Sequence, residues 1–124
     1  MATAQVVTLT EKKSTSVKKI SWDWLSTNLG VVTSASVNTY DGLLERAVFI
    51  PDAAGTQPTN AYDVTITDSD STDVLAGLGA DLSNAATVTK VHSNGLGAVA
   101  GSVLTLNVSN AGDAKGGQVI LYLR

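Results

Sequence analysis

The chain is poor in the residue types that most often carry enzyme or redox chemistry. Its 124 residues include no cysteine, one histidine (His92) and two glutamates, Glu11 and Glu45. The lack of cysteine excludes disulfides and thiolate-bound metals. A general acid or base would have to come from very few groups. We therefore expect a non-enzymatic protein that needs no cofactor.

Motifs for nucleophilic catalysis and phosphate binding are missing as well. No serine stands in a G-x-S-x-G elbow. The Gly-rich segment NGLGAVAG lacks the Lys-Ser/Thr ending of a phosphate loop and is better interpreted as a turn. A triad of His92 with an aspartate and a serine is the third-ranked functional hypothesis, and replacing His92 with alanine should abolish any activity that depends on it.

Long apolar runs are also absent. Polar residues interrupt the N-terminal segment MATAQVVTLTEKK, which does not have the pattern of a signal peptide. No stretch approaches the roughly 20 apolar residues that span a bilayer. We expect a soluble protein that makes no membrane contact.

Acidic residues outnumber basic ones, and the excess lies in the second part of the chain. The net charge is −3; residues 1–50 hold five basic and four acidic side chains, whereas residues 51–124 hold three basic and seven acidic ones. The only basic cluster consists of Lys12, Lys13, Lys18 and Lys19. Because no arginine or aromatic residue is interleaved with it, we expect no nucleic-acid partner. The lysines suit either an acidic protein partner or a solvated strand edge.

Alternating apolar and polar residues indicate an all-β fold. In YDVTIT, residues 62–67, the apolar side chains point one way and the polar ones the other. Turn residues separate similar segments at regular spacing, which predicts a single-domain antiparallel β-sandwich, jelly-roll-like, of about eight strands. The expected strands lie near residues 4–10, 16–25, 31–38, 44–50, 61–68, 87–92, 102–109 and 117–123, with a short extended piece near 73–76. We assign residues 1–15 to an N-terminal arm or first strand and residues 16–124 to the sandwich.

The strand patterns also predict the core. Two sets of apolar residues at period two should point inward: Ile20, Trp22 and Trp24, and Leu104, Leu106 and Val108. Both tryptophans are therefore expected to anchor the core. The alternative is an exposed aromatic platform for carbohydrate.

The last expected strand, QVILYLR, is apolar on both faces. Val119, Leu121 and Leu123 lie on one face, and Ile120 and Tyr122 lie on the other. A soluble monomer rarely leaves such a stripe exposed to water. The strand is therefore either central and covered on both sides, or has one face that is buried only in an assembly.

Asp68, Asp70 and Asp73 are the strongest metal-ligand candidates. Calcium binds clustered carboxylate oxygens on a turn. A calcium loop of the EF-hand type requires glycine at its sixth position and glutamate at its twelfth, but counting from Asp68 gives Asp73 and Gly79. The main interpretation is therefore a solvated turn, with a bound cation as the alternative.

Three segments resemble a family of small virion structural proteins of tailed bacteriophages. They are GLLERAVFIPDAAGTQPTNAYDV, YDVTITDSDSTDVLAGLGADLS and SVLTLNVSNAGDAKGGQVILYLR, which together cover roughly residues 40–124; the strand with Trp22 and Trp24 resembles the family more weakly. In that family a Tyr-Asp-Val strand leads into an acidic turn, and a Gly-rich turn precedes a final Val-Ile-Leu-Tyr strand. Ser71-Thr72 stands where a glycine commonly closes the acidic turn.

The resemblance implies a non-enzymatic capsid decoration or cement protein that binds the major capsid protein on the outside of the head and stabilises the head. Such a protein would be made in the host cytoplasm, located on the virion, and would contact copies of itself, with a trimer as one arrangement. We expect residues 1–19 to contact the capsid protein, and the strand 117–123 or the loop 51–60 to join copies. The expected contact residues are Lys12, Lys13, Lys18, Lys19, Pro51, Pro58, Ile120 and Tyr122. The alternative is an adhesion or glycan-binding module of a tail or fibre, with the loops 51–60 and 94–101 as its binding site.

Overall fold

Nine β-strands build the fold in the computed structural model, which describes residues 4–124. The strands are β1 (Val6–Lys12), β2 (Lys18–Leu25), β3 (Val32–Ala35), β4 (Tyr40–Pro51), β5 (Asp63–Thr67), β6 (Val88–Val91), β7 (Ala98–Ser102), β8 (Thr105–Ser109) and β9 (Gly116–Leu123). Two short 3₁₀ turns, η1 (Ala54–Thr56) and η2 (His92–Asn94), lie in the connections. Within residues 4–124, no helix has the length and apolar character to cross a bilayer.

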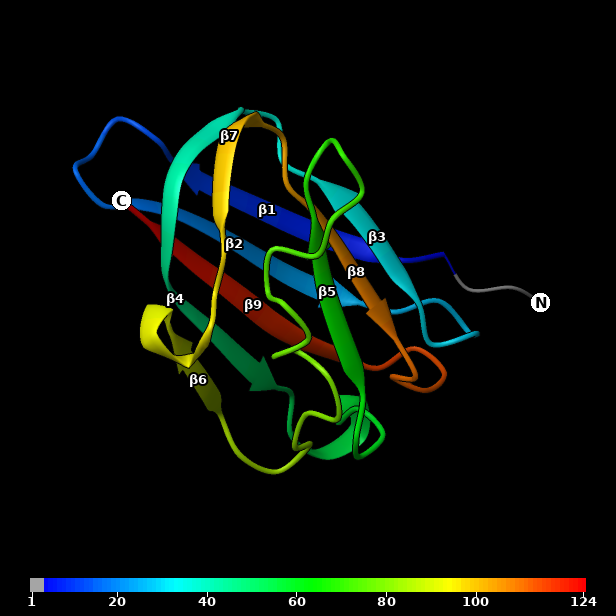
Figure 1. The fold of residues 1–124 in the computed structure, drawn as a ribbon. Helices are drawn as coiled ribbons and strands as arrows, with labels where there is room; N and C mark the ends of the chain where they lie inside the picture. Colours follow the sequence, from blue (N-terminus) through cyan, green and yellow to red (C-terminus); the bar gives the residue numbers. More distant parts are fainter. Residues whose placement is uncertain (1–3) are drawn as a thin grey trace.

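The strands form two antiparallel sheets that face each other. The larger sheet has the order β1-β2-β9-β4-β6, and β7 pairs with the first part of β4. The smaller sheet has the order β3-β8-β5. Figure 1 shows the smaller sheet lying in front of β1, β2 and β9, on one face of the larger sheet. The predicted all-β sandwich is therefore confirmed.

The core lies between the two sheets and contains the predicted aromatic anchors. Trp22 and Trp24 are 0% and 2% exposed, and the Trp24 ring packs against Tyr62 with 5.8 Å between ring centroids. The inward set of the other sheet, Leu104, Leu106 and Val108, is also buried. Burial of large side chains of this kind is the main favourable term in folding. The prediction that both tryptophans anchor the core is confirmed.

Three elements differ from the sequence prediction. The strand expected at 44–50 begins earlier, at Tyr40, and a register shift between Leu44 and Arg46 makes Glu45 an extra residue opposite β9. This bulge allows one long strand to pair with β9 and β6 in its second part and with β7 in its first. The strand β7 itself lies mostly within 94–101, which was predicted to be a loop. The piece near 73–76 forms turns and one isolated bridge, between Thr67 and Asp73.

The N-terminal segment and the acidic turn take specific places in this fold. Residues 6–12 form a full edge strand that pairs with β2 along its length. Residues 1–3 of the expected arm lie outside the described residues. In the acidic turn Ser71 has a φ of 62°, the left-handed region in which glycine is favoured. The serine thus adopts a backbone conformation that is strained for residues with a side chain and unstrained for glycine.

Candidate binding surface

The outer face of the larger sheet is the most distinctive surface of the molecule. The smaller sheet covers the inner face of the larger sheet, and no strand within residues 4–124 packs on the outer face. Directly opposed residues in antiparallel strands share a face, so the register arranges the outward side chains in rows that cross β1, β2, β9, β4 and β6. We name three parts of this surface: the basic row, the neutral row and the acidic end.

The basic row contains three cations and no acidic residue. In order across the sheet it consists of Lys12, Lys19, Tyr122, Arg46 and Val91. The Tyr122 ring lies between two cations, with Lys19 Nζ 5.9 Å and Arg46 Cζ 4.2 Å from its centroid. These contacts are of the cation–π type, and the aliphatic stems also shield the ring. Lys12 lies directly opposite Lys19, a like-charge pair that disfavours the isolated sheet.

The neutral row lies next to the basic row and holds the apolar centre of the face. It consists of Thr10, Ser21, Ile120, Val48 and Thr89. Ile120 and Val48 are half-buried by their neighbours rather than by a second layer. On the opposite face of the same strand, Val119, Leu121 and Leu123 are fully buried. The strand β9 is therefore central within its sheet, and its second apolar face is directed outward.

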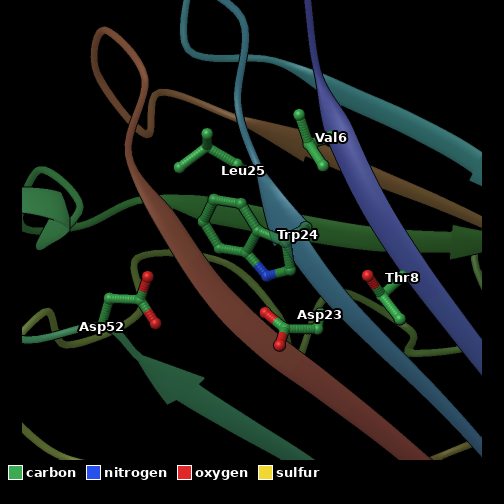
Figure 2. Close-up of a pocket in the computed structure, with 6 residues that line it drawn as sticks. All are labelled: Val6, Thr8, Asp23, Trp24, Leu25 and Asp52. Atoms are coloured by element: carbon green, nitrogen blue, oxygen red, sulfur yellow. The ribbon is translucent and has the colours of Figure 1, made fainter.

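The acidic end lies at the other end of the strands. One row holds Thr8, Asp23, Gln118 and Ile50, and the last row holds Val6, Leu25 and Gly116 with Asp52 beyond. An open depression of about 220 Å³ lies here, lined in part by Asp23 and Asp52. Figure 2 shows these two carboxylates on either side of β9. A Cβ atom at Gly116 would lie 2.5 Å from Asp52 Oδ2, so a larger residue at this position would displace the Asp52 carboxylate.

The expected contact residues are distributed unequally over this surface. Ile120, Tyr122, Lys12 and Lys19 belong to the outer face, while Lys13 and Lys18 flank the tip of the β1–β2 hairpin. Pro51 ends β4 and is half-buried. Pro58 is buried, and its carbonyl oxygen accepts a hydrogen bond of 3.0 Å from Asn84 Nδ2. We therefore correct the prediction for Pro58, which anchors its loop instead of presenting a contact surface.

The acidic turn uses its carboxylates to hold its own backbone. Asp68 Oδ1 accepts hydrogen bonds from the amides of Asp70 and Thr72, each at 3.0 Å. Asp73 accepts from three amides, those of Ile66, Leu75 and Gly77. Within residues 4–124 no group of three or more histidine, cysteine, aspartate or glutamate side chains is placed to hold a metal ion. Asp68 and Asp73 therefore act as turn-capping groups, whereas Asp70 takes part through its backbone amide.

The residues considered for catalysis or glycan binding are dispersed. His92 is exposed on η2. The buried hydroxyls of Ser26 and Ser36 donate to the backbone carbonyls of Gly112 and Asn38, at 2.8 Å each. Both tryptophans are in the core, which removes the exposed rings that an aromatic glycan platform would need.

Sequence reasoning identified the basic cluster and the outward residues of β9 but did not identify the acidic end. Asp23 lies between the two tryptophans on β2, and no local pattern connects it with Asp52, which follows β4. The register of three strands, β2, β9 and β4, brings the two carboxylates together. Comparison of the chain with protein-family models, with curated proteins and with solved structures gave no match.

Proposed function

We propose that this chain is a non-enzymatic structural protein of a tailed-phage virion, and within that class a decoration or cement protein that binds the major capsid protein on the outside of the head. The setting rests on the resemblance of three segments within residues 40–124 to small virion proteins of tailed phages. The β-sandwich is compatible with it as a rigid building block.

The single observation that carries the proposal is the outer face of β9. Ile120 and Tyr122 lie on a broad strand face that no second layer covers within residues 4–124, with Lys19 and Arg46 beside the tyrosine ring. Tyrosine and arginine are enriched at protein–protein contacts, and a partly apolar patch with a charged border is typical of such surfaces. A protein that works by adhesion to other proteins needs a surface of this kind and no reactive groups.

The tip of the β1–β2 hairpin is the proposed contact with the capsid protein. Lys13 and Val17 are exposed there, and Lys18 begins the next strand. Deletion of residues 1–12 is an unsuitable test of this contact, because it would remove all of β1 from the larger sheet. Charge reversal at the tip leaves the strand pairing intact.

Binding to heads tests the proposal. Heads would be isolated from the phage that encodes the chain, after deletion of its gene, and mixed with the purified protein before sedimentation. We expect saturable co-sedimentation, which Lys13→Glu with Lys18→Glu should weaken at least about tenfold. The control is Lys90→Glu on β6, which should bind as the natural protein does.

Absence of co-sedimentation at any concentration would overturn the proposed function. If the hairpin variant co-sediments with heads as strongly as the natural protein does, only the assignment of the contact to the hairpin tip is overturned.

A further inference from the structure

The two ends of the outer sheet face carry opposite charge. Lys12, Lys19 and Arg46 form the basic row, and Arg124 follows β9 at the same end. Glu45 is an acidic residue next to Arg46 in sequence, but it is the extra residue of the bulge and does not belong to the basic row. At the other end, Asp23 and Asp52 border the depression. The strands thus run between a basic end and an acidic end, with the neutral row of Ile120 and Val48 between them.

We propose that the partner of this face is a second copy of the chain, packed face to face with its strands running in the opposite direction. A two-fold axis parallel to the sheet and perpendicular to the strands produces this arrangement. It superposes the basic row of each copy on the acidic end of the other. The inference rests on the proposed function for its biological role, but its test needs no virion.

The register shows how the contacts would match. With the axis over the neutral row, Ile120 and Val48 of one copy meet the same residues of the other. Lys19 then faces Asp23 of the second copy, because each lies one row from the axis on β2. The two-fold axis generates the same pair a second time, with Asp23 of the first copy facing Lys19 of the second. The like-charge pair of Lys12 with Lys19 gains an acidic neighbour, which offsets a repulsion present in the single copy.

Charge complementarity favours a second copy over a different protein. The hairpin tip, proposed to contact the capsid protein, lies beyond the basic row at the end of the sheet. The outer face therefore remains available for self-association. Lys115 is the cation near the acidic end, and its Nζ donates a hydrogen bond of 3.0 Å to the carbonyl oxygen of Gly55. That hydrogen bond engages the lysine within its own chain.

The size of the face sets the expected strength of the contact. With strands about 4.8 Å apart, the face is roughly 20 Å wide, and the rows extend over a similar length. A patch of roughly 400 Å² lies below the ~800 Å² per partner of a standard stable interface. The dimer should therefore be weak in dilute solution, and stronger where copies are held side by side on an array.

A charge-swap experiment tests the proposal. Variant A carries Asp23→Lys and Asp52→Lys, which makes both ends of the face basic, and variant B carries Lys12→Glu and Lys19→Glu, which makes both ends acidic. Sedimentation equilibrium would be measured up to about 1 mM protein at low salt. We expect the natural chain to form dimers. Each variant alone should dissociate at least about tenfold more readily, and an equimolar mixture of A and B should form heterodimers.

Matched controls separate the face from total charge. Asp70→Lys with Asp113→Lys repeats the charge change of variant A at exposed sites away from the face, and Lys90→Glu reverses a cation that lies outside the basic row. Both controls should dimerise as the natural chain does. If a lysine variant fails to fold, Asp23→Asn with Asp52→Asn replaces it and should still weaken the dimer.

Three results would overturn the inference. They are a natural chain that stays monomeric at about 1 mM, an oligomer that neither variant weakens, and a mixture of A and B that does not associate. A monomeric chain that still binds heads would refute the face-to-face dimer and leave the proposed function standing.

Discussion

At the scale of single residues, Glu11 performs a structural task that its sequence context does not indicate. It lies on β1, yet its carboxylate accepts hydrogen bonds from the amides of Val37 and Asn38, at 3.1 and 3.2 Å, and from Tyr40 Oη at 2.8 Å. These bonds join the edge strand of the larger sheet to the turn that precedes β4. Burial and this carboxylate both raise the pKa of the Tyr40 hydroxyl above its ordinary value.

Replacing Glu11 with alanine should lower the free energy of unfolding by about 2–3 kcal/mol, because the fully buried Tyr40 loses the acceptor of its hydroxyl and two amides lose theirs. Glu11→Gln, which keeps one acceptor oxygen, should lose less. Urea unfolding followed by tryptophan fluorescence would measure both. The only other glutamate provides the control: Glu45→Ala should change stability by less than about 1 kcal/mol, and an equal loss in both variants would refute the role of Glu11.

Tyr62 makes the stability of the protein sensitive to alkaline pH. Burial and, secondarily, the negative charge of Asp52 raise its pKa from 10.0 to about 12. Above pH 10 the unfolded chain therefore loses this proton before the folded chain does, so the unfolded state binds fewer protons and the free energy of unfolding falls. The stabilisation is fully present below pH 10 and is lost as the pH rises toward 12.

Urea unfolding at intervals between pH 9 and pH 11.5, a window chosen around the shift to about 12, should show this decline. Tyr62→Phe removes the titrating group and should flatten part of the slope, while Tyr40 supplies the remainder. Identical slopes for the natural chain and Tyr62→Phe would show that Tyr62 does not ionise differently in the two states.

At the scale of elements, the path of β9 depends on small residues at its start. Gly117 lies opposite Trp24 in β2 and Pro51 in β4. A Cβ atom at this position would lie 2.8 Å from the carbonyl oxygen of Ile50 and 2.9 Å from Trp24 Cζ2. Both neighbours belong to the packed centre of the fold, so neither can move away without disturbing the core.

Gly117→Ala should therefore destabilise the fold by about 1–3 kcal/mol through overpacking. Thermal unfolding would detect this as a lower midpoint with unchanged circular dichroism in the folded state. Gly55 is the matched control, since a Cβ atom there would have no neighbour within 4 Å. A Gly55→Ala variant that loses as much stability as Gly117→Ala would contradict this explanation.

Most strands could be predicted from the sequence because their apolar residues alternate, as at Ile20, Trp22 and Trp24. The strand β7, with the sequence AVAGS, was missed because it has one large apolar residue and a glycine, and it is placed by pairing with β4. The bulge at Glu45 and the hydrogen bonds of Glu11 depend on contacts between distant segments. The acidic end was missed for the same reason, since period and composition describe single strands and register relates different ones.

At the scale of the whole molecule, the chain is a disulfide-free β-sandwich that buries one face of its larger sheet and presents the other. The inner face holds the tryptophans, and the outer face carries the basic row, the neutral row and the acidic end. The proposed role divides these surfaces: the hairpin tip contacts the capsid protein, and the sheet face contacts a second copy. The charge-swap experiment tests only the contact between two copies. The proposed capsid contact and the proposed dimer can therefore be refuted independently of each other.

The proposed function places this chain on the outside of a phage head. A cryo-electron microscopy reconstruction of virions from the phage that encodes it tests this claim most directly. We expect density on the outer head surface that fits the nine-stranded sandwich, with the β1–β2 hairpin directed at the coat. Particles that lack the chain, or that carry it only in the tail, would contradict the claim.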